Sequence, residues 1–186
     1  MTALTIYPDN QPQHGELFKD FADIQNQLKP IGVQFEQWKS EHELAANADQ
    51  ASVLSAYATS IEKLKAECHF QSVDVMKLNP DHPDRAVFRQ KFLAEHVHED
   101  FEVRFFVEGR GLFYLHVNNK VFAVLCEQGD LISVPANTPH WFDMGENPKF
   151  TCIRLFTTTD GWVANFTGSE IAKDFPSFDG YVAALA

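Results

Sequence analysis

The sequence lacks long apolar runs and has few cysteines. No stretch approaches the roughly 18 apolar residues of a membrane-spanning helix, and no basic segment followed by an apolar one opens the chain, as in a secretory signal. The three cysteines, Cys68, Cys126 and Cys152, form no Cys-x-x-Cys pair, which argues against a disulfide framework and a structural zinc site. We expect a cytoplasmic protein without a membrane partner, with reduced and mostly buried thiols.

Positive charge is scarce as well. Lysine and arginine number 15 against 26 aspartates and glutamates, which gives a formal net charge of -11. Nucleic acids and anionic membranes bind to positive surfaces, so both are disfavoured as partners. An anionic small-molecule substrate would have to find arginines placed locally in its site.

The chain has the length and composition of a single globular domain. It has 186 residues, of which 45% are apolar and 22% charged, and no Pro/Gly/Ser-rich linker divides it. We expect a monomer in which residues 1–186 form one domain. The pattern changes near residue 90, which predicts an N-terminal α+β portion (1–90), a β-barrel core (91–166) and a C-terminal helix and tail (167–186).

Helical periodicity dominates the N-terminal portion. Phe18, Phe21, Ile24 and Leu28 recur at helical spacing before a Pro30-Ile-Gly stop. Apolar residues follow the same period in a second segment, and paired prolines precede a third. The sequence therefore predicts helices over 18–28, 51–65 and 84–92, and strands over 33–38 and 73–78.

From about residue 98 the apolar period changes to two, as in β-strands. The predicted strands are 103–107, 112–117, 121–125, 131–134, 150–156 and 162–166. Turn-forming residues separate them, beginning with Gly109-Arg-Gly111. Short strands at this spacing favour an antiparallel sandwich or barrel.

One constellation carries metal-binding chemistry. The chain reads His96-x-His98-x3-Glu102, and His140 follows in an Asn-Thr-Pro-His-Trp turn. Residues of equal parity on a strand share a face, so His96, His98, Glu102 and Arg104 point into one cavity if no bulge breaks the register. Asp100 has the same parity, so it either lines the pocket or lies on a local bend.

Three imidazoles and one carboxylate suit a first-row transition metal. Four protein ligands in an octahedral shell leave two positions for water or substrate, whereas a structural zinc site is usually closed. A His-x-His pair alone is more often solvated than a ligand pair, but four such residues together favour metal. His14, His42, His69 and His82 carry no spacing signal and are expected at the surface; His116 is expected at the core or rim.

The same residues match a known pattern. Glu102-x6-Gly109 and Gly129-x5-Pro135-x4-His140 reproduce the two halves of a cupin signature. The chain thus resembles a cupin, which implies a mainly β fold: a double-stranded β-helix, or jelly-roll barrel, with the N-terminal helical segment packed on it. The chain departs from the pattern at three positions that are not ligands, Gln90, Asn137 and Met144.

Longer blocks narrow the resemblance. Residues 92–109, 130–145 and 153–156 are similar to the acireductone dioxygenases of methionine salvage, and the similarity covers most of the chain. Phe101 stands where that family commonly has an acidic residue, which puts any role of that position in doubt. The ligand set is unaffected.

The resemblance implies a metal-dependent dioxygenase that cleaves 1,2-dihydroxy-3-keto-5-methylthiopentene, an acireductone, with O2. In the family, Fe(II) gives 4-methylthio-2-oxobutanoate and formate, whereas Ni(II) gives 3-methylthiopropionate, formate and carbon monoxide. One Fe(II) or Ni(II) ion per chain is expected on His96, His98, Glu102 and His140. The sequence does not distinguish the two metals, because this donor set accepts both.

Further site residues follow from the chemistry of an enediolate dianion with an apolar tail. Arg104 and Arg154 are candidates to pair with the dianion. Glu95, beside the first ligand, is a candidate to assist metal loading, but a carboxylate at the surface or one that supports a ligand from behind is the preferred interpretation. The residues expected to wall the methylthio end are Phe92, Phe105, Phe142 and Trp162. For each aromatic residue, ordinary core packing is an equally good interpretation.

Two other functions remain compatible with the sequence. One is a different metal-dependent cupin enzyme, such as another dioxygenase or a sugar-phosphate isomerase. The other is a non-catalytic cupin that binds a small molecule or stores metal.

Overall fold

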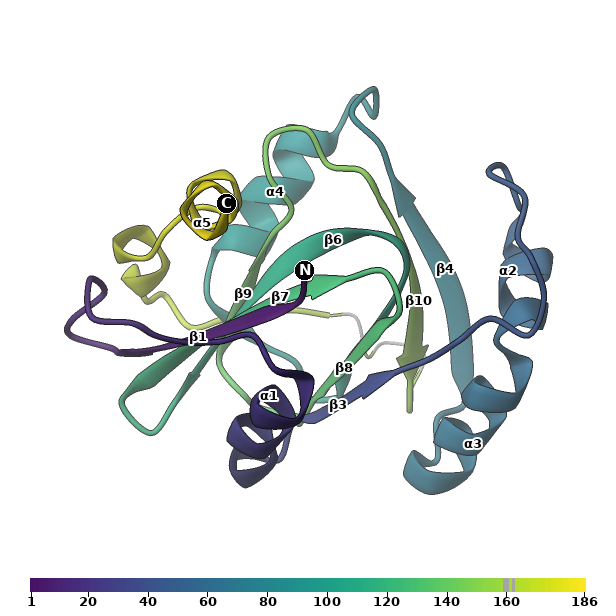
Figure 1. The fold of residues 1–186 in the computed structure, drawn as a ribbon, viewed down its shortest axis with the longest axis horizontal. Coiled ribbons are helices and arrows are strands. Elements are labelled where there is room, and N and C mark those ends of the chain that lie inside the picture. The colour runs from purple at the N-terminus through teal and green to yellow at the C-terminus, as the bar shows by residue number, and fades with distance from the viewer. Residues whose placement is uncertain (159–160, 162) are drawn as a thin grey trace.

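The computed structural model of the chain describes residues 1–158, 161 and 163–186. Within these ranges no helix is both long enough and apolar enough to traverse a bilayer. Strands account for most of the regular structure and the helices lie around them (Figure 1). The expectation of a mainly β barrel with helices packed outside is confirmed.

One long strand, β6 (Glu102–Val117), belongs to both sheets of the barrel. Its first half pairs with β8 (Asp130–Val134) and β10 (Phe150–Phe156). Its second half pairs with β7 (Lys120–Glu127) and β9 (His140–Asp143). All four pairings are antiparallel, so β6 carries the chain from one wall of the barrel to the other.

The remaining strands extend the two sheets. The first sheet runs β3-β8-β6-β10-β4, and the second runs β11-β5-β9-β6-β7-β1-β2. The N-terminal strands β1, β3 and β4 are therefore full members of the barrel. The additional strands are β1 (Ala3–Pro8), β2 (Glu16–Phe18), β3 (Gln34–Gln37), β4 (Ser72–Leu78), β5 (His96–Val97) and β11 (Asn165–Phe166).

The predicted turn at Gly109-Arg110-Gly111 is wrong, because β6 continues through it. Gly109 has a φ of +77°, and a Cβ atom there would lie 1.9 Å from the carbonyl oxygen of Lys149. Only glycine allows both the left-handed backbone and this close approach to the neighbouring chain. The glycine thus bends the strand between the two sheets instead of ending it.

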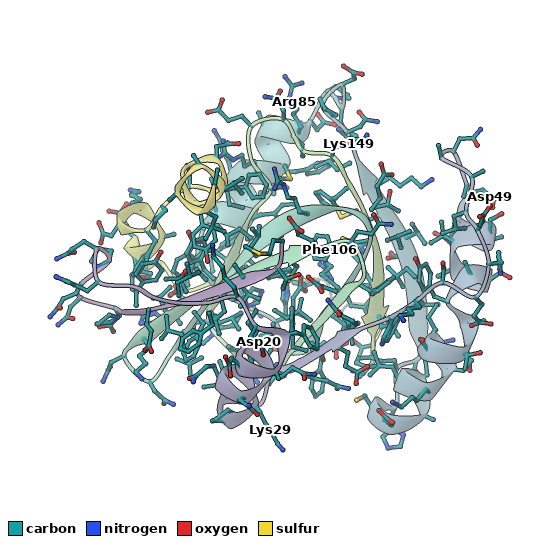
Figure 2. The ribbon with its side chains drawn as sticks, in the orientation of Figure 1. Asp20, Lys29, Asp49, Arg85, Phe106 and Lys149 are labelled. Carbon is teal, nitrogen blue, oxygen red and sulfur yellow. The ribbon has the colours of Figure 1, made fainter. Side chains whose placement is uncertain are left out.

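The helices are α1 (Phe21–Leu28), α2 (Gln50–Ala56), α3 (Ala58–Cys68), α4 (Arg85–Leu93) and α5 (Phe178–Leu185). Asp20 caps α1 by accepting hydrogen bonds from the backbone N–H groups of Ala22 and Asp23 (Figure 2). The predicted helix over 51–65 is two helices, since Tyr57 between them has a φ of -127° and leaves the helical conformation.

Three apolar clusters hold the layers together. The first lines the barrel interior and includes Phe106 and Phe113. The second joins the outer face of the first sheet to α2 and α3, and the third joins the outer face of the second sheet to α5. Each sheet therefore buries both faces, which leaves the barrel interior available for a cavity.

Helix α4 is fixed to the barrel by an ion pair. Arg89 donates two hydrogen bonds to Asp143 of β9, at 2.8 and 3.0 Å. Asp143 is 1% exposed and also accepts from the backbone N–H groups of Gly145 and Phe178. The pair positions the α4 side chains Phe88 and Phe92 against the barrel core.

Candidate metal centre

Three histidines, two on short strands and one just after a strand, meet inside the barrel. His96 on β5 is the register partner of His140 on β9, and His98 follows β5. A ligand nitrogen of each of the three lies within 4.8 Å of the others. All three side chains are buried. Strand pairing thus brings together residues that are distant in sequence.

Each imidazole is held by a backbone carbonyl through its Nδ1 atom. The partners are the oxygens of Ala94 for His96 (2.8 Å), Val163 for His98 (2.7 Å) and Thr138 for His140 (2.8 Å). A carbonyl oxygen only accepts, so Nδ1 carries the proton in all three rings. The unprotonated Nε2 atoms remain, and Nε2 of His140 is buried without a partner in the part of the chain that the structure describes.

Burial favours the neutral form of His140 and His96. Desolvation lowers the pKa of His140 to about 4, and it also lowers the pKa of His96. Neutral imidazole is the form that binds metal. At neutral pH these two imidazoles can therefore act as nitrogen ligands without first losing a proton.

Glu102 lies at the edge of this cluster. Its Oε2 atom is 3.5 Å from Nε2 of His98, and its Oε1 atom is 2.7 Å from Nη2 of Arg104. Burial acts to raise the pKa of the Glu102 carboxyl, but favourable charge interactions, of which that with Arg104 is the largest, outweigh it, so the pKa is lowered. Oε2 is buried and, among the described residues, accepts no hydrogen bond.

Nε2 of His140 and Oε2 of Glu102, which are buried without partners among the described residues, are the kind of atoms that a metal site provides. Buried polar atoms without partners are rare in proteins and call for an explanation such as an ion. Three neutral imidazoles and one carboxylate suit iron, nickel or another divalent transition metal. The carbonyls behind the rings supply the second set of contacts that orients metal-binding histidines. The residues present fit a metal ion.

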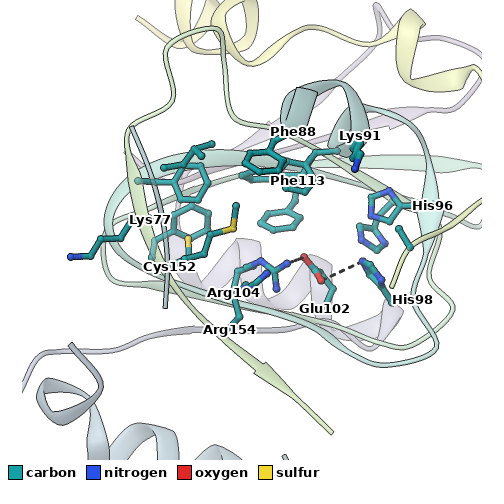
Figure 3. A pocket seen from close by; sticks show the side chains of 18 of the residues that line it. Lys77, Phe88, Lys91, His96, His98, Glu102, Arg104, Phe113, Cys152 and Arg154 are labelled. Carbon is teal, nitrogen blue, oxygen red and sulfur yellow. Dashed lines mark ion pairs between the residues drawn. The ribbon is translucent and has the colours of Figure 1, made fainter. Parts of the chain in front are cut away.

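A cavity of about 720 Å³ opens from this cluster into the barrel. Figure 3 shows His96 and His98 at one end, Arg104 and Arg154 in the middle, and Cys152 at the other end. Phe88 and Lys91 of α4 lie along one side. The cavity is thus polar and metal-binding at one end and mainly apolar at the other, which suits an elongated ligand with two unlike ends.

Both predicted arginines line the cavity. Arg104 pairs with Glu102 and also donates a hydrogen bond from Nη1 to the carbonyl oxygen of Val103 at 3.0 Å. Arg154 makes two hydrogen bonds to Asp74, at 2.7 and 2.5 Å. The positive charge of Arg154 is therefore largely neutralised by Asp74. The partner of Arg104 is Glu102, which also belongs to the candidate metal site.

The predicted aromatic wall is only partly assembled. Phe92 and Phe142 line the cavity, and their ring centroids are 6.1 Å apart. Phe105 does not: it is fully buried on the opposite face of β6, where its ring lies 4.9 Å from Trp38 and 4.6 Å from Tyr57. Neighbouring residues on a strand face opposite sides, which excludes Phe105 from a cavity that Arg104 faces. Trp162 lies outside the described residues.

Glu95 is not among the described residues that line the cavity, and its part in metal loading stays a prediction. The carboxylate is 4% exposed, lies 2.9 Å from Nδ1 of His116 and accepts a hydrogen bond from Oγ1 of Thr167 at 2.7 Å. Nε2 of His116 lies 3.3 Å from Asp9. Glu95 therefore ties β5 to β6 and to the segment after β11.

Asp100 lies on a bend, which decides between the two positions left open by its parity. It accepts hydrogen bonds from the backbone N–H groups of Phe101, Thr157 and Thr158 and from the Thr157 hydroxyl. The chain leaves β-structure after Val97 and resumes it at Glu102. The predicted ligands His96, His98 and Glu102 therefore converge although they do not lie on one continuous strand, as the prediction from alternating side chains had assumed.

Several residues of the cavity wall were not predicted from the sequence. His82, expected at the surface, lines the cavity, and its ring centroid is 5.3 Å from that of Phe88. The period-two pattern of β4, β6 and β10 carries a usable signal for the others, because alternate residues of each strand face inward. These residues are Met76, Leu78, Phe106, Phe113, Phe150 and Cys152.

Comparisons with known proteins agree with this geometry. The family model described as "ARD/ARD' family" matches residues 3–164. Acireductone dioxygenase of Methylococcus capsulatus is 52% identical over 186 residues, covering 100% of both chains. That of Aquifex aeolicus is 51% identical over 185 residues, covering 98% of this chain and 99% of its own.

A solved structure has the same fold. It is the acireductone dioxygenase from Bacillus anthracis with a cadmium ion in its active centre. The TM-score is 0.79 at 28% identity, and the match covers 89% of this chain and 98% of that one.

Proposed function

The chain belongs to the ARD/ARD' family of acireductone dioxygenases, and from that premise we propose that it adds dioxygen to 1,2-dihydroxy-3-keto-5-methylthiopentene. This substrate has an enediol beside a ketone at one end and a methylthio group at the other. The cavity has a polar end that suits the enediol and an apolar end that suits the methylthio group. The partners are then a small molecule and O2.

His96, His98, His140 and Glu102 are the residues that would hold one divalent iron or nickel ion. When bound, such an ion would supply a Lewis acid for the oxygens of the substrate. The backbone carbonyls behind the three rings keep each Nε2 atom directed into the site. This common arrangement of the three histidines is the observation that carries the proposal.

Arg104 is the residue that would stabilise the ionised enediol. Its guanidinium lines the cavity and is held in place by Glu102 and by the Val103 carbonyl. A fixed cation in a buried site favours the charged form of a ligand far more than a solvated one does. Arg104 thereby offsets the repulsion that an acidic chain exerts on a dianion.

The apolar side chains have a separate task. Phe92 and Phe142 close one side of the cavity, and Phe166 of β11 lies beside His96 with a centroid separation of 6.0 Å. By excluding bulk water they strengthen the electrostatic contacts of the bound substrate and protect a reactive dianion from protonation.

The metal is expected to select the products. With iron(II) we expect formate and 4-methylthio-2-oxobutanoate; with nickel(II) we expect formate, carbon monoxide and 3-methylthiopropionate. The test is anaerobic reconstitution of metal-free protein with each metal, followed by addition of substrate and oxygen and by product analysis. Two distinct product sets support the proposal. Metal binding without consumption of oxygen in either form contradicts it.

A further inference from the structure

Three strands of the first sheet present their cavity-facing side chains in rows. β4, β10 and β6 are neighbours, and register partners on antiparallel strands place their side chains on the same face. The row nearest the metal-binding end holds Asp74, Arg154 and Arg104, of which the two arginines line the cavity. The next row into the barrel holds Met76, Cys152 and Phe106. One wall of the cavity thus changes from charged to apolar within a single step along the strands.

The second row has an unusual chemical character. All three of its side chains line the cavity, and two of them contain sulfur. Cys152 is 1% exposed, and burial raises the pKa of its thiol, so the thiol stays neutral. The Phe106 ring lies 6.4 Å from that of Phe113 and 6.2 Å from that of Phe150, measured between centroids. Sulfur and aromatic rings together offer a soft, polarisable surface that favours another thioether and rejects charge.

The distance between the rows matches the length of the substrate tail. Two residues along a strand span about 6.6 Å. From the ketone carbon to the terminal methyl group the substrate has four single bonds of about 1.5 Å each, which span roughly 5 Å when extended. If Arg104 contacts the ionised head, the methylthio group therefore reaches the next row.

We propose that Met76, Cys152 and Phe106 form the subsite for the methylthio tail and set which tails the enzyme accepts. This inference rests on the proposed function, which supplies the enediol head and its orientation. Phe92 and Phe142 close one side of the cavity. Met76, Cys152 and Phe106 form a second, sulfur-containing wall on β4, β10 and β6. This wall also gives a role to a buried cysteine that is too weakly acidic to act as a nucleophile.

The test compares two substrates. One is the methylthio acireductone, and the other is its analogue with a methyl group in place of the whole methylthioethyl tail. Met76→Ala and Cys152→Ala should each lower the ratio of kcat/KM for the tailed over the tail-less substrate by about tenfold, the effect of a small volume change in an apolar pocket. Anaerobic binding of both substrates to the nickel-loaded variants should show the same change in ratio.

Cys126→Ala is the matched control, because Cys126 is equally buried in the same core but does not line the cavity. It should leave the ratio within about twofold of wild type, far below the tenfold steps expected for a changed pocket. If an alanine variant does not fold, Met76→Leu or Cys152→Ser replaces it. Each nearly keeps the volume but removes the sulfur atom that favours a thioether, so the ratio should still fall.

An unchanged ratio in the Met76 and Cys152 variants overturns the subsite while leaving the dioxygenase assignment intact. Failure of the wild-type protein to consume oxygen with either substrate overturns the proposed function, and the subsite with it.

Discussion

Nε2 of His98 lies 3.5 Å from Oε2 of Glu102, and neither group faces solvent. Oε2 has no hydrogen-bond donor among the described residues, although it is buried. The contact joins the histidine cluster to the one carboxylate of the predicted ligand set. If both atoms bind the same ion, removing the charge of Glu102 should affect metal affinity first.

Glu102→Gln keeps the shape of the side chain and removes its negative charge. We expect its affinity for nickel(II) to fall by at least about 100-fold, since loss of groups that only support ligands already costs roughly 10- to 100-fold. Competition with a chromophoric chelator measures this. The control is Glu108→Gln, an exposed glutamate of the same strand that lies 3.5 Å from Lys149. Equal affinities of the two variants would show that the three histidines suffice.

Arg104→Ala should leave one metal ion per chain and lower kcat by roughly 100- to 1,000-fold, as removal of one fixed donor to a developing oxyanion does. Atomic absorption reports the metal, and oxygen uptake at saturating substrate reports turnover. Arg110→Ala, at a more exposed arginine of the same strand, should retain wild-type rates. Loss of metal from the Arg104 variant would instead assign it the structural task of holding Glu102.

Acid should destabilise the metal-free protein through His140. Its pKa is about 4 in the folded chain against an ordinary value of 6.5, so between these values only the unfolded chain takes up the proton. The free energy of unfolding therefore falls as the pH drops from 6.5 toward 4, with a contribution from His140 of about 3 kcal/mol at the acid end.

Denaturant unfolding at a series of pH values measures this effect. His140→Gln has no titrating group at this position, so its stability should fall less steeply over the same window than that of the wild type. Parallel curves for the two proteins would show that His140 is not kept neutral by burial.

Glu95→Ala should lower stability without lowering metal content. It removes the acceptor of Thr167 and the partner of His116 in a buried position, a change that costs about 1–3 kcal/mol. Denaturant unfolding and the rate of nickel uptake distinguish the two roles considered for this residue. Glu99→Ala, at an exposed carboxylate of the same segment, controls for charge. Slow metal uptake at unchanged stability would support the loading role.

The metal-binding end of the cavity could be read from the sequence because its determinants are local. His96, His98 and Glu102 lie within seven consecutive positions, and Arg104 follows Glu102 at equal parity on β6. Because side chains alternate along a strand, Phe105 faces away from the side of β6 that Arg104 faces. Its assignment to the cavity wall was therefore wrong on sequence grounds alone. The position of His140 depends on the pairing of β9 with β5, for which its turn gave the only sequence signal.

Other features depend on contacts that no local pattern encodes. The pairing of Arg154 with Asp74, and of Glu95 with His116, follows from which strands become neighbours. The continuity of β6 through Gly109 depends on the approach of Lys149. We propose that the portions 1–90, 91–166 and 167–186 fold as one unit, because β1 and β4 complete the pairing of β7 and β10.

The central claim is that this chain inserts both atoms of dioxygen into an acireductone. The most direct measurement is a reaction of the iron(II)-loaded protein under isotopically labelled oxygen, with mass analysis of the products. We predict one labelled atom in formate and one in the carboxylate of 4-methylthio-2-oxobutanoate, since cleavage between the two enediol carbons leaves one new oxygen on each. Unlabelled products, or no cleavage by a fully metal-loaded protein, would contradict the account.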